Sequence, residues 1–260
     1  MAETQIRFDD GAAYEEMMGI WSRLAGDVFL DWLAPSAGLR WIDVGCGNGA
    51  STAMIVDRCA PCEIQGIDPS AGQLAYARSR LAGSVAEFRQ GEGAALPFPD
   101  GNFDVGVMAL VIFFLPDPAK GVAELVRVVR PGGMVATYAW DMLGGGFTLE
   151  PIYAEIRKLG ISPIMPPSSE AARIDALRGL WTNAGIEAIE TREITVQRTF
   201  ADFDDFWMSS TKGPGMAALN LGPDALQHVK QNVKAGLPAD SAGRVTCTAR
   251  ANAVKGHKPS

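Results

Sequence analysis

The chain has 260 residues, of which 47% are hydrophobic and 20% are charged, so a disordered or fibrous protein is excluded. Its net charge of −7 has the wrong sign for binding nucleic acid through the overall field, and nucleic acid is not an expected partner. No apolar run reaches the roughly 18 residues of a membrane-spanning helix. Residues 1–10 lack the pattern of a signal peptide. Four cysteines in this length are typical of a reducing compartment, so we expect a cytoplasmic location.

From residue 38 to residue 140, short β-rich runs alternate with amphipathic helical patterns. This alternation predicts an open, mostly parallel sheet with right-handed crossovers. The predicted strands are Leu39–Val44, Glu63–Asp68, Ala86–Gln90, Phe103–Leu110 and Met134–Trp140. The predicted helices between them are Ala50–Arg58, Ala71–Leu81 and Pro118–Val129, the last one stopped by a turn at Arg130–Gly133.

Beyond residue 140 the pattern changes. The triplet Gly144-Gly145-Gly146 predicts a flexible break, and apolar residues at helical spacing predict a helix from Ile174 that ends at Gly185. Residues 201–240 are amphipathic and predicted to be helical. Two further strands are expected, Glu187–Arg198 with a bulge between Ile189 and Ile194, and Arg244–Val254 with Val245, Cys247, Ala249, Ala251 and Ala253 on one face.

A glycine-rich segment, Trp41–Gly49, lies at the junction of the first predicted strand and helix. Glycines let the backbone adopt positive φ and approach a ligand closely. Ligands of open α/β sheets bind beyond the carboxyl ends of the strands. Asp68 closes the second strand, 19 residues after Gly49, where a carboxylate can accept hydrogen bonds from both hydroxyls of a ribose. The pattern therefore predicts a site for a ribose-bearing cofactor.

Two details distinguish between cofactors. The loop reads G-x-G-x-G followed by Ala50, whereas dinucleotide sites favour G-x-G-x-x-G. Asp43 precedes the first glycine by two residues, where its carboxylate would repel a diphosphate and attract an ammonium or sulfonium group. A cationic nucleoside is therefore expected, and a nicotinamide oxidoreductase is a distant alternative.

Four motifs follow one another along the chain: Ile42–Gly49, Gly66–Ser70, Gly91–Phe98, and Leu115–Pro118 through to Arg130–Gly133. On these motifs the chain resembles the class I S-adenosylmethionine-dependent methyltransferases, in the branch that includes ubiquinone/menaquinone-type C-methyltransferases and many small-molecule enzymes. The segment Tyr14–Ser22 is similar to a cofactor-covering N-terminal helix of some relatives. The resemblance is strong over about residues 10–140 and weak afterwards.

The resemblance implies a Rossmann-like α/β fold with a seven-stranded, mostly parallel sheet, helices on both faces and an antiparallel last strand. It implies S-adenosyl-L-methionine as cofactor, with its methionine part at the backbone of Gly45–Gly49, its amino group near Asp43, and its ribose on Asp68. Gln73 would lie against the adenine, and Glu92 would accept a hydrogen bond from the adenine amino group. The implied cofactor-binding residues are Tyr14, Trp21, Asp43, Gly45, Cys46, Gly47, Asn48, Asp68, Pro69, Ser70, Gln73, Glu92, Gly93, Ala94, Ala109, Leu110 and Val111.

We expect a single domain over residues 1–260. Its predicted parts are an N-terminal helical lid (1–36), a cofactor-binding core (38–140), two insertions that cover the substrate (141–185 and 200–243), and the final strands (187–198 and 244–254). The acceptor would be a small, partly apolar molecule. The alternative from another class is a non-catalytic protein that binds S-adenosylmethionine or S-adenosylhomocysteine.

No catalytic base is predicted, because Phe113 and Phe114 stand where related enzymes often have a histidine. His228 is expected at the surface and His257 in a frayed terminus. Asp141, just past the fifth strand, is equally consistent with a loop acid and with a catalytic group. Trp140, Phe147 and Trp207 are weak candidates for the substrate pocket.

Two other chemistries are disfavoured. Cys59-Ala60-Pro61-Cys62 follows a helix and precedes a strand, whereas a redox dithiol opens a helix, and one such pair lacks two of the four ligands of structural zinc. A hard cation would need acids clustered after the fourth strand, and residues 109–115 contain none. We therefore expect inert cysteines and no metal.

Overall fold

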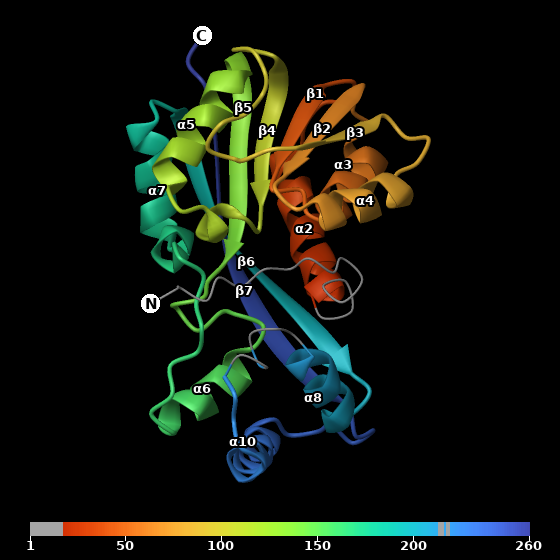
Figure 1. Cartoon of the computed structure of the whole chain (residues 1–260), viewed down its shortest axis with the longest axis vertical. Helices are drawn as coiled ribbons and strands as arrows, with labels where there is room; N and C mark the ends of the chain where they lie inside the picture. The colour runs from red at the N-terminus through yellow and green to blue at the C-terminus, as the bar shows by residue number, and fades with distance from the viewer. Residues whose placement is uncertain (1–17, 213–215, 217–218) are drawn as a thin grey trace.

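A seven-stranded sheet in the order β3-β2-β1-β4-β5-β7-β6 forms the centre of this computed structural model, which describes residues 18–212, 216 and 219–260 (Figure 1). Neighbouring strands from β3 to β5 are parallel, and β7 is antiparallel to both β5 and β6. The strands are β1 (Arg40–Val44), β2 (Glu63–Asp68), β3 (Ala86–Gln90), β4 (Phe103–Ala109), β5 (Val129–Trp140), β6 (Glu187–Phe200) and β7 (Val245–His257). The predicted mostly parallel sheet with an antiparallel last strand is confirmed.

Helices cover both faces of the sheet, with α5 and α7 on one side and α2, α3 and α4 on the other (Figure 1). Two predicted helix starts are confirmed, because Ser70 Oγ accepts from Gln73 N at 3.3 Å and Asp117 Oδ1 accepts from Lys120 N at 3.0 Å. The helices are α2 (Ile20–Leu33), α3 (Ala50–Cys59), α4 (Ala71–Arg80), α5 (Pro118–Val128), α6 (Glu150–Lys158), α7 (Ile174–Asn183), α8 (Phe203–Thr211) and α10 (Pro223–Gly236), with 3₁₀ turns η2 (Ile112–Phe114) and η3 (Ser169–Ala172).

The start of β5 differs from the prediction. The strand begins at Val129 rather than Met134, because Arg130–Gly133 forms an irregularity within it and not a separate turn. Val129 pairs with Phe103, and the next pair along the two strands joins Met134 to Val105. The extra residues leave the pleat at Gly132, whose φ is +68°. A glycine-rich segment can therefore lie inside a strand when it supplies a bulge.

The pair β6–β7 extends beyond the rest of the sheet. The last pair between β5 and β7 is Trp140↔Ala251, and Ala251 also pairs with Ile194 of β6. From there six further pairs continue without β5, ending at Phe200↔Val245. The expected bulge in β6 lies earlier than predicted, between Glu187 and Glu190. The predicted buried face of β7 is confirmed, from Val245 through Ala253.

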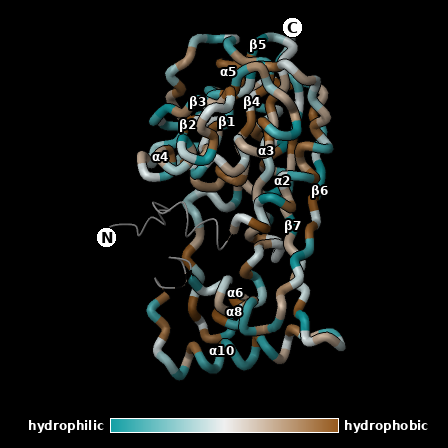
Figure 2. Tube along the Cα trace, turned by 90° about the vertical axis from the view of Figure 1, so that its right-hand side faces the viewer, coloured by the Kyte–Doolittle hydropathy of each residue, from teal (hydrophilic) through white to brown (hydrophobic). Residues whose placement is uncertain are grey.

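A second group of helices surrounds this extension. Helices α6, α8 and α10 lie past the carboxyl end of β5, and both views show them apart from the layers of the sheet (Figures 1 and 2). We call them, with the ends of β6 and β7, the helical lobe. The predicted insertion 141–185 is divided, because α6 belongs to the lobe whereas α7 packs against β6 and β7. The proposed roles of the insertions, like the single-domain division, remain predictions.

Two local expectations are wrong. Gly144-Gly145-Gly146 is not a flexible break, because Gly144 N donates to Asp141 Oδ1 at 3.0 Å and Gly146 N donates to Asp141 O at 2.9 Å. His257 is not in a frayed terminus, since it is the last residue of β7 and pairs with Met134. Arg250, more than a hundred residues further along the chain, also donates to Gly144 O and Gly146 O, and such distant contacts supply order that the local sequence does not indicate.

Candidate functional site

The glycine-rich segment forms a tight turn between β1 and α3. Gly45, Gly47 and Gly49 have φ of +73°, +52° and +77°, which side chains disfavour. The N–H groups of Gly45 and Cys46 both donate to Ile67 O, at 2.7 and 3.0 Å, and this ties the turn to β2. A Cβ on Gly47 would meet no atom within 4 Å. The turn is thus fixed on one side and open above Gly47, as a backbone cradle for a ligand requires.

Asp68 connects two of the predicted motifs. Its Oδ2 accepts from Gly47 N at 3.0 Å and its Oδ1 accepts from Ser70 N at 2.9 Å. These bonds lower the pKa of Asp68, but burial, the largest influence, and the nearby Glu92 raise it above the ordinary value. Each carboxylate oxygen has a second lone pair. Asp68 is therefore held in one orientation with acceptor capacity left over.

Asp43 is a fully buried carboxylate within the candidate site. Its Oδ2 accepts from the Thr52 hydroxyl at 2.7 Å, its Oδ1 has no partner in hydrogen-bond geometry among the described residues, and the hydroxyls of Thr52 and Ser51 both lower its pKa. Burial raises the pKa of Asp43 to about 6, and the charge of Asp68 adds to this effect. A buried acceptor without a donor is costly unless a ligand completes it. The site therefore offers a negative group that a bound cation would stabilise.

The end of β4 lies against the glycine turn. A Cβ on Gly45 would come within 2.2 Å of Val111 Cγ2, so only glycine allows this contact. Leu110 has a φ of +56°, an uncommon conformation for a branched side chain, and its N–H donates to Tyr138 O at 2.9 Å. Strained residues held by their surroundings are frequent at functional sites. The predicted border of the methyl-transfer site, Ala109, Leu110 and Val111, is thus close to the turn. We call the carboxyl ends of β1, β2 and β4 the carboxyl edge.

The adenine side of the predicted site also reaches this edge. Gly93 is buried beside Val44, since a Cβ on it would lie 3.1 Å from Val44 Cγ1. Glu92 is exposed and close enough to Asp68 to raise its pKa. Gln73 is buried in the first turn of α4. Of the remaining predicted residues, Pro69 is exposed and Ala94 is half-buried.

Three further predicted residues have side-chain contacts of their own. Trp21 packs against Phe200 of the helical lobe, with ring centroids 6.3 Å apart. The Cys46 side chain packs in a small cluster with Leu74 and Phe88, and burial raises the pKa of its thiol well above the ordinary value. Asn48 Oδ1 accepts from Ala50 N at 3.2 Å. Tyr14 is outside the described residues.

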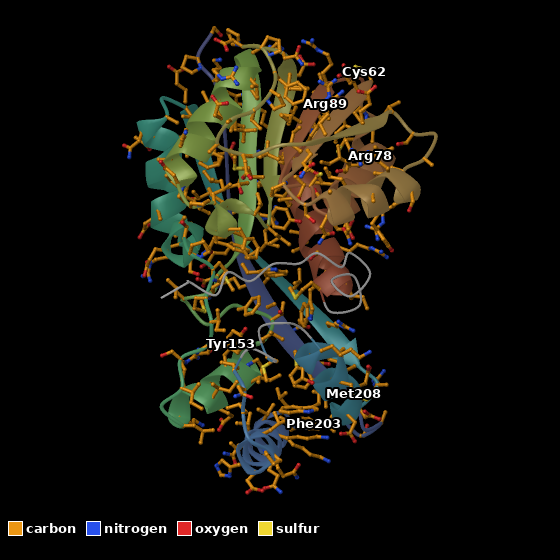
Figure 3. The ribbon with its side chains drawn as sticks, in the orientation of Figure 1. Cys62, Arg78, Arg89, Tyr153, Phe203 and Met208 are labelled. Carbon is orange, nitrogen blue, oxygen red and sulfur yellow. The ribbon has the colours of Figure 1, made fainter. Side chains whose placement is uncertain are left out.

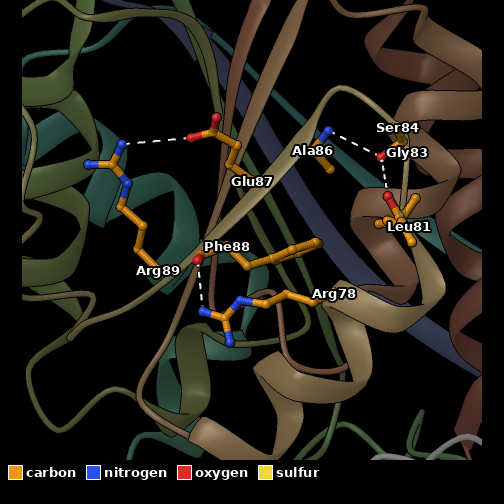
Figure 4. A pocket seen from close by; sticks show the side chains of 9 residues that line it. Arg78, Leu81, Gly83, Ser84, Ala86, Glu87, Phe88 and Arg89 are labelled. Carbon is orange, nitrogen blue, oxygen red and sulfur yellow. Dashed lines mark hydrogen bonds and ion pairs between the residues drawn. The ribbon is translucent and has the colours of Figure 1, made fainter.

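Sequence reasoning missed one contributor. The Thr52 hydroxyl donates to Asp43, and no motif marks a hydroxyl nine residues after a buried acid. A hollow of about 560 Å³ beside α2 and α3, lined by Arg23 and Ala50 among others, contains none of the predicted site residues. A second hollow, of about 370 Å³, lies between the end of α4 and β3 and contains none of the predicted site residues (Figure 4).

The three candidate bases have different surroundings. His228 is exposed on α10, as predicted, and His257 ends β7. Asp141 is buried and paired with Arg250, whose Nη2 lies 2.5 Å from Asp141 Oδ2. Within the described part of the chain, no three His, Cys, Asp or Glu residues are placed to hold a metal ion. The described helices include none long and apolar enough to cross a membrane.

The helical lobe is lined by aromatic residues. Tyr153 of α6 and Phe203 of α8 both lie in it (Figure 3). Phe147 is 5.7 Å from Tyr153 between ring centroids, and Trp207 stacks on Phe203 at 6.1 Å. Trp140, at the end of β5, is buried, and its indole Nε1 has no acceptor among the described residues.

The comparisons with known proteins agree with this geometry. Residues 42–137 match the family model described as a methyltransferase domain. The match covers strands β2 to β4 and most of β1 and β5, and the sheet that contains them is Rossmann-like.

One curated relative, a demethylmenaquinone methyltransferase of Desulfitobacterium hafniense, is 39% identical over 107 residues, which are 38% of this chain and 42% of that protein. The chain matches about half the length of the first curated relatives, between 42% and 56%. Among solved structures, YcgJ of Bacillus subtilis has a TM-score of 0.62 at 14% identity and covers 92% of this chain and 99% of its own. Phosphoethanolamine N-methyltransferase 2 of Haemonchus contortus, in complex with S-adenosyl-L-methionine, has a TM-score of 0.62 at 16% identity, covering 96% of this chain and 57% of its own. These two likenesses concern the fold.

Proposed function

We propose that the protein transfers the methyl group of S-adenosyl-L-methionine to a small, partly apolar acceptor. The observation that carries the proposal is the unpartnered, fully buried Oδ1 of Asp43 below the glycine turn. A carboxylate in that place favours a cationic ligand and disfavours a diphosphate. The match of residues 42–137 to the methyltransferase domain supports the same cofactor.

Each residue at the carboxyl edge has a proposed task. The backbone of Gly45–Gly49 holds the methionine part, and Asp43 balances its positive charge. Asp68, whose orientation is set by Gly47 N and Ser70 N, accepts from the ribose hydroxyls. Glu92 and Gln73 contact the adenine. The cofactor supplies an activated methyl group, so this chain contributes alignment of the two reactants and exclusion of water. Alignment can lower the activation barrier by roughly 7–11 kcal/mol.

The acceptor is proposed to lie between the end of β4 and the helical lobe. Ser168 ties the long insertion to this place, because its N–H donates to Phe113 O at 3.0 Å and its hydroxyl donates to Leu115 O at 2.6 Å. The surroundings that the structure describes include the aromatic residues Tyr153 and Phe203. The name of the relative from Desulfitobacterium hafniense, a demethylmenaquinone methyltransferase, supports an aromatic, oxygen-bearing acceptor. The four cysteines are free thiols, which supports the predicted cytoplasmic location.

The test combines binding and turnover. Calorimetry should show that the full chain binds S-adenosylhomocysteine and does not bind NAD. Labelled methyl transfer should then be measured with a panel of reduced naphthoquinones, catechols and small amines. Binding together with incorporation into one acceptor class supports the proposal. Binding without incorporation into any acceptor favours the non-catalytic alternative, and tight binding of NAD alone contradicts the proposed cofactor.

A further inference from the structure

An ion pair joins the end of β5 to the root of the extended β6–β7 pair. Arg250 of β7 reaches Asp141, the residue after β5, with Nη2 and Nε at 2.5 and 3.0 Å from Asp141 Oδ2. The Asp141 side chain is only 9% exposed, whereas that of Arg250 is 36% exposed. The pair lies one residue past Trp140↔Ala251, after which β6 and β7 continue without β5.

The same two residues also fix the loop that leads into the lobe. Arg250 Nη2 donates to Gly144 O at 3.0 Å, Gly144 N donates to Asp141 Oδ1 at 3.0 Å, and Arg250 N donates to Gly146 O at 2.8 Å. There is no room for side chains at the glycines. A Cβ on Gly144 would lie 2.2 Å from Asp141 Oδ2, and one on Gly146 would lie 2.8 Å from Arg250 Cβ. The glycines allow the loop to close tightly around the ion pair.

This loop connects the lobe to the N-terminal helix. Two residues after Gly146, the buried Thr148 hydroxyl contacts Met18 Sδ at 3.5 Å, just before α2. The chain then enters α6 at Glu150, and α6 packs against α10. The direction in which the chain leaves Asp141 therefore sets where the helical lobe stands over the carboxyl edge.

We infer that Asp141 and Arg250 are positioning residues that hold the helical lobe over the carboxyl edge and thereby set the affinity for the methyl acceptor, but not for the cofactor. The inference rests on the proposed function for the identity of the reaction. The selectivity concerns the glycine turn and Asp68, because β4 and β5 separate β7 from β1 and β2, the strands that carry them. Asp141 is thus assigned to positioning and not to proton transfer.

The experiment compares three variants in the full chain. Asp141→Asn and Arg250→Gln remove one charge each, and Arg250→Lys keeps the charge but loses the planar fork that binds both Asp141 and Gly144. The control, Arg244→Gln, breaks the exposed pair Asp240–Arg244 at the far end of the β6–β7 extension. Circular dichroism checks folding, and Arg250→Lys is the milder variant should a charge deletion prevent it.

Two readouts are measured. Hydrogen exchange of the amides in residues 142–149 should become at least tenfold faster in the two charge-deletion variants, and less so in Arg250→Lys, while exchange in residues 45–50 stays unchanged. With reduced 1,4-naphthoquinone as the acceptor probe, KM should rise at least tenfold, whereas the Kd of S-adenosylhomocysteine should stay within twofold. The control should change neither readout.

The inference is overturned if exchange in residues 142–149 does not change, or if cofactor affinity falls as much as acceptor affinity. The proposed function fails separately, when the unmodified protein binds no S-adenosylhomocysteine. If that protein methylates no naphthoquinol, the exchange readout still decides whether the ion pair holds the loop.

Discussion

The carboxyl edge and the helical lobe are stabilised by different kinds of contact. At the carboxyl edge, main-chain groups make the contacts: the glycine turn bonds to Ile67 O, and Asp68 accepts from two backbone N–H groups. In the helical lobe, side chains make them, as in the stack of Phe203 on Trp207 and the exposed pair Lys230–Asp204. A substitution at the edge therefore meets a fixed backbone, whereas one in the lobe meets side chains that can repack.

The largest expected effect is at the glycine turn. Gly45→Ala should destabilise the protein by about 2–4 kcal/mol, because it combines a positive φ with a clash against Val111. Gly47→Ala shares the positive φ but meets open space, so about 1 kcal/mol is expected. Urea unfolding of both variants measures the difference. Equal losses would show that the contact with Val111 does not constrain the turn.

The next effect concerns Asp68. Asp68→Ala should weaken S-adenosylhomocysteine binding by about 1–3 kcal/mol, because the ribose hydroxyls and the N–H groups of Gly47 and Ser70 lose their acceptor. Calorimetry on the folded variant measures this change. Asp204→Ala, which removes an exposed carboxylate in the helical lobe, is the matched control and should leave the affinity unaltered. An unchanged affinity in Asp68→Ala would remove this residue from the site.

Asp43 predicts a pH dependence. Its pKa of about 6 lies above the ordinary 3.8, so the folded protein holds a proton that the unfolded chain has released between these pH values. This contribution to folding stability therefore decreases as pH rises from about 4 to 6. The ammonium group of S-adenosylhomocysteine is expected to pair with the ionised form of Asp43, so the affinity should rise as pH increases towards 6, up to tenfold per unit, and level off above.

The measurement is the Kd of S-adenosylhomocysteine at pH 5, 6 and 7. Asp43→Asn keeps the shape of the side chain but cannot ionise, and its affinity should be lower and flat with pH over this range. A profile that is as steep in Asp43→Asn as in the unmodified protein would assign the titration to another group.

The smallest effect compares two buried tryptophans. Trp140 and Trp41 each have an indole Nε1 without an acceptor among the described residues, but Trp140 ends β5 beside the lobe whereas Trp41 lies near the amino end of β1. Trp140→Phe should weaken binding of an oxygen-bearing acceptor by about 1 kcal/mol, since the indole N–H is the donor lost. Trp41→Phe should not. The measurement is the KM of the acceptor for each variant. Equal KM values would contradict the assignment of the Trp140 indole N–H as a donor to the acceptor.

The carboxyl edge could be predicted well from the sequence because its parts are local. The glycine positions predict a turn, and the predicted bounds of β2 and β3 are the ones that the structure has. The helix predicted to begin at Ala71 does so, and its N-cap bond joins Ser70 to Gln73 within one helical turn. The roles of the individual residues towards the cofactor remain predictions.

What could not be predicted depends on contacts across the chain. The bulge before Met134 exists because β5 must keep its register with β4, and Arg130–Gly133 alone indicates a turn. Gly144 is ordered by Arg250, 106 residues away. The bond between Thr52 and Asp43 likewise joins a helix to a strand, and no spacing rule marks it. Such pairs are visible only once the topology is known.

The extended β6–β7 pair has a consequence for how this scaffold can be altered. The pair satisfies its own backbone hydrogen bonds for six residue pairs past the sheet, so these bonds need no further strand beside β7. A graft that exchanges the segments attached to this ribbon would therefore need to keep Asp141 and Arg250, which join the ribbon to the end of β5.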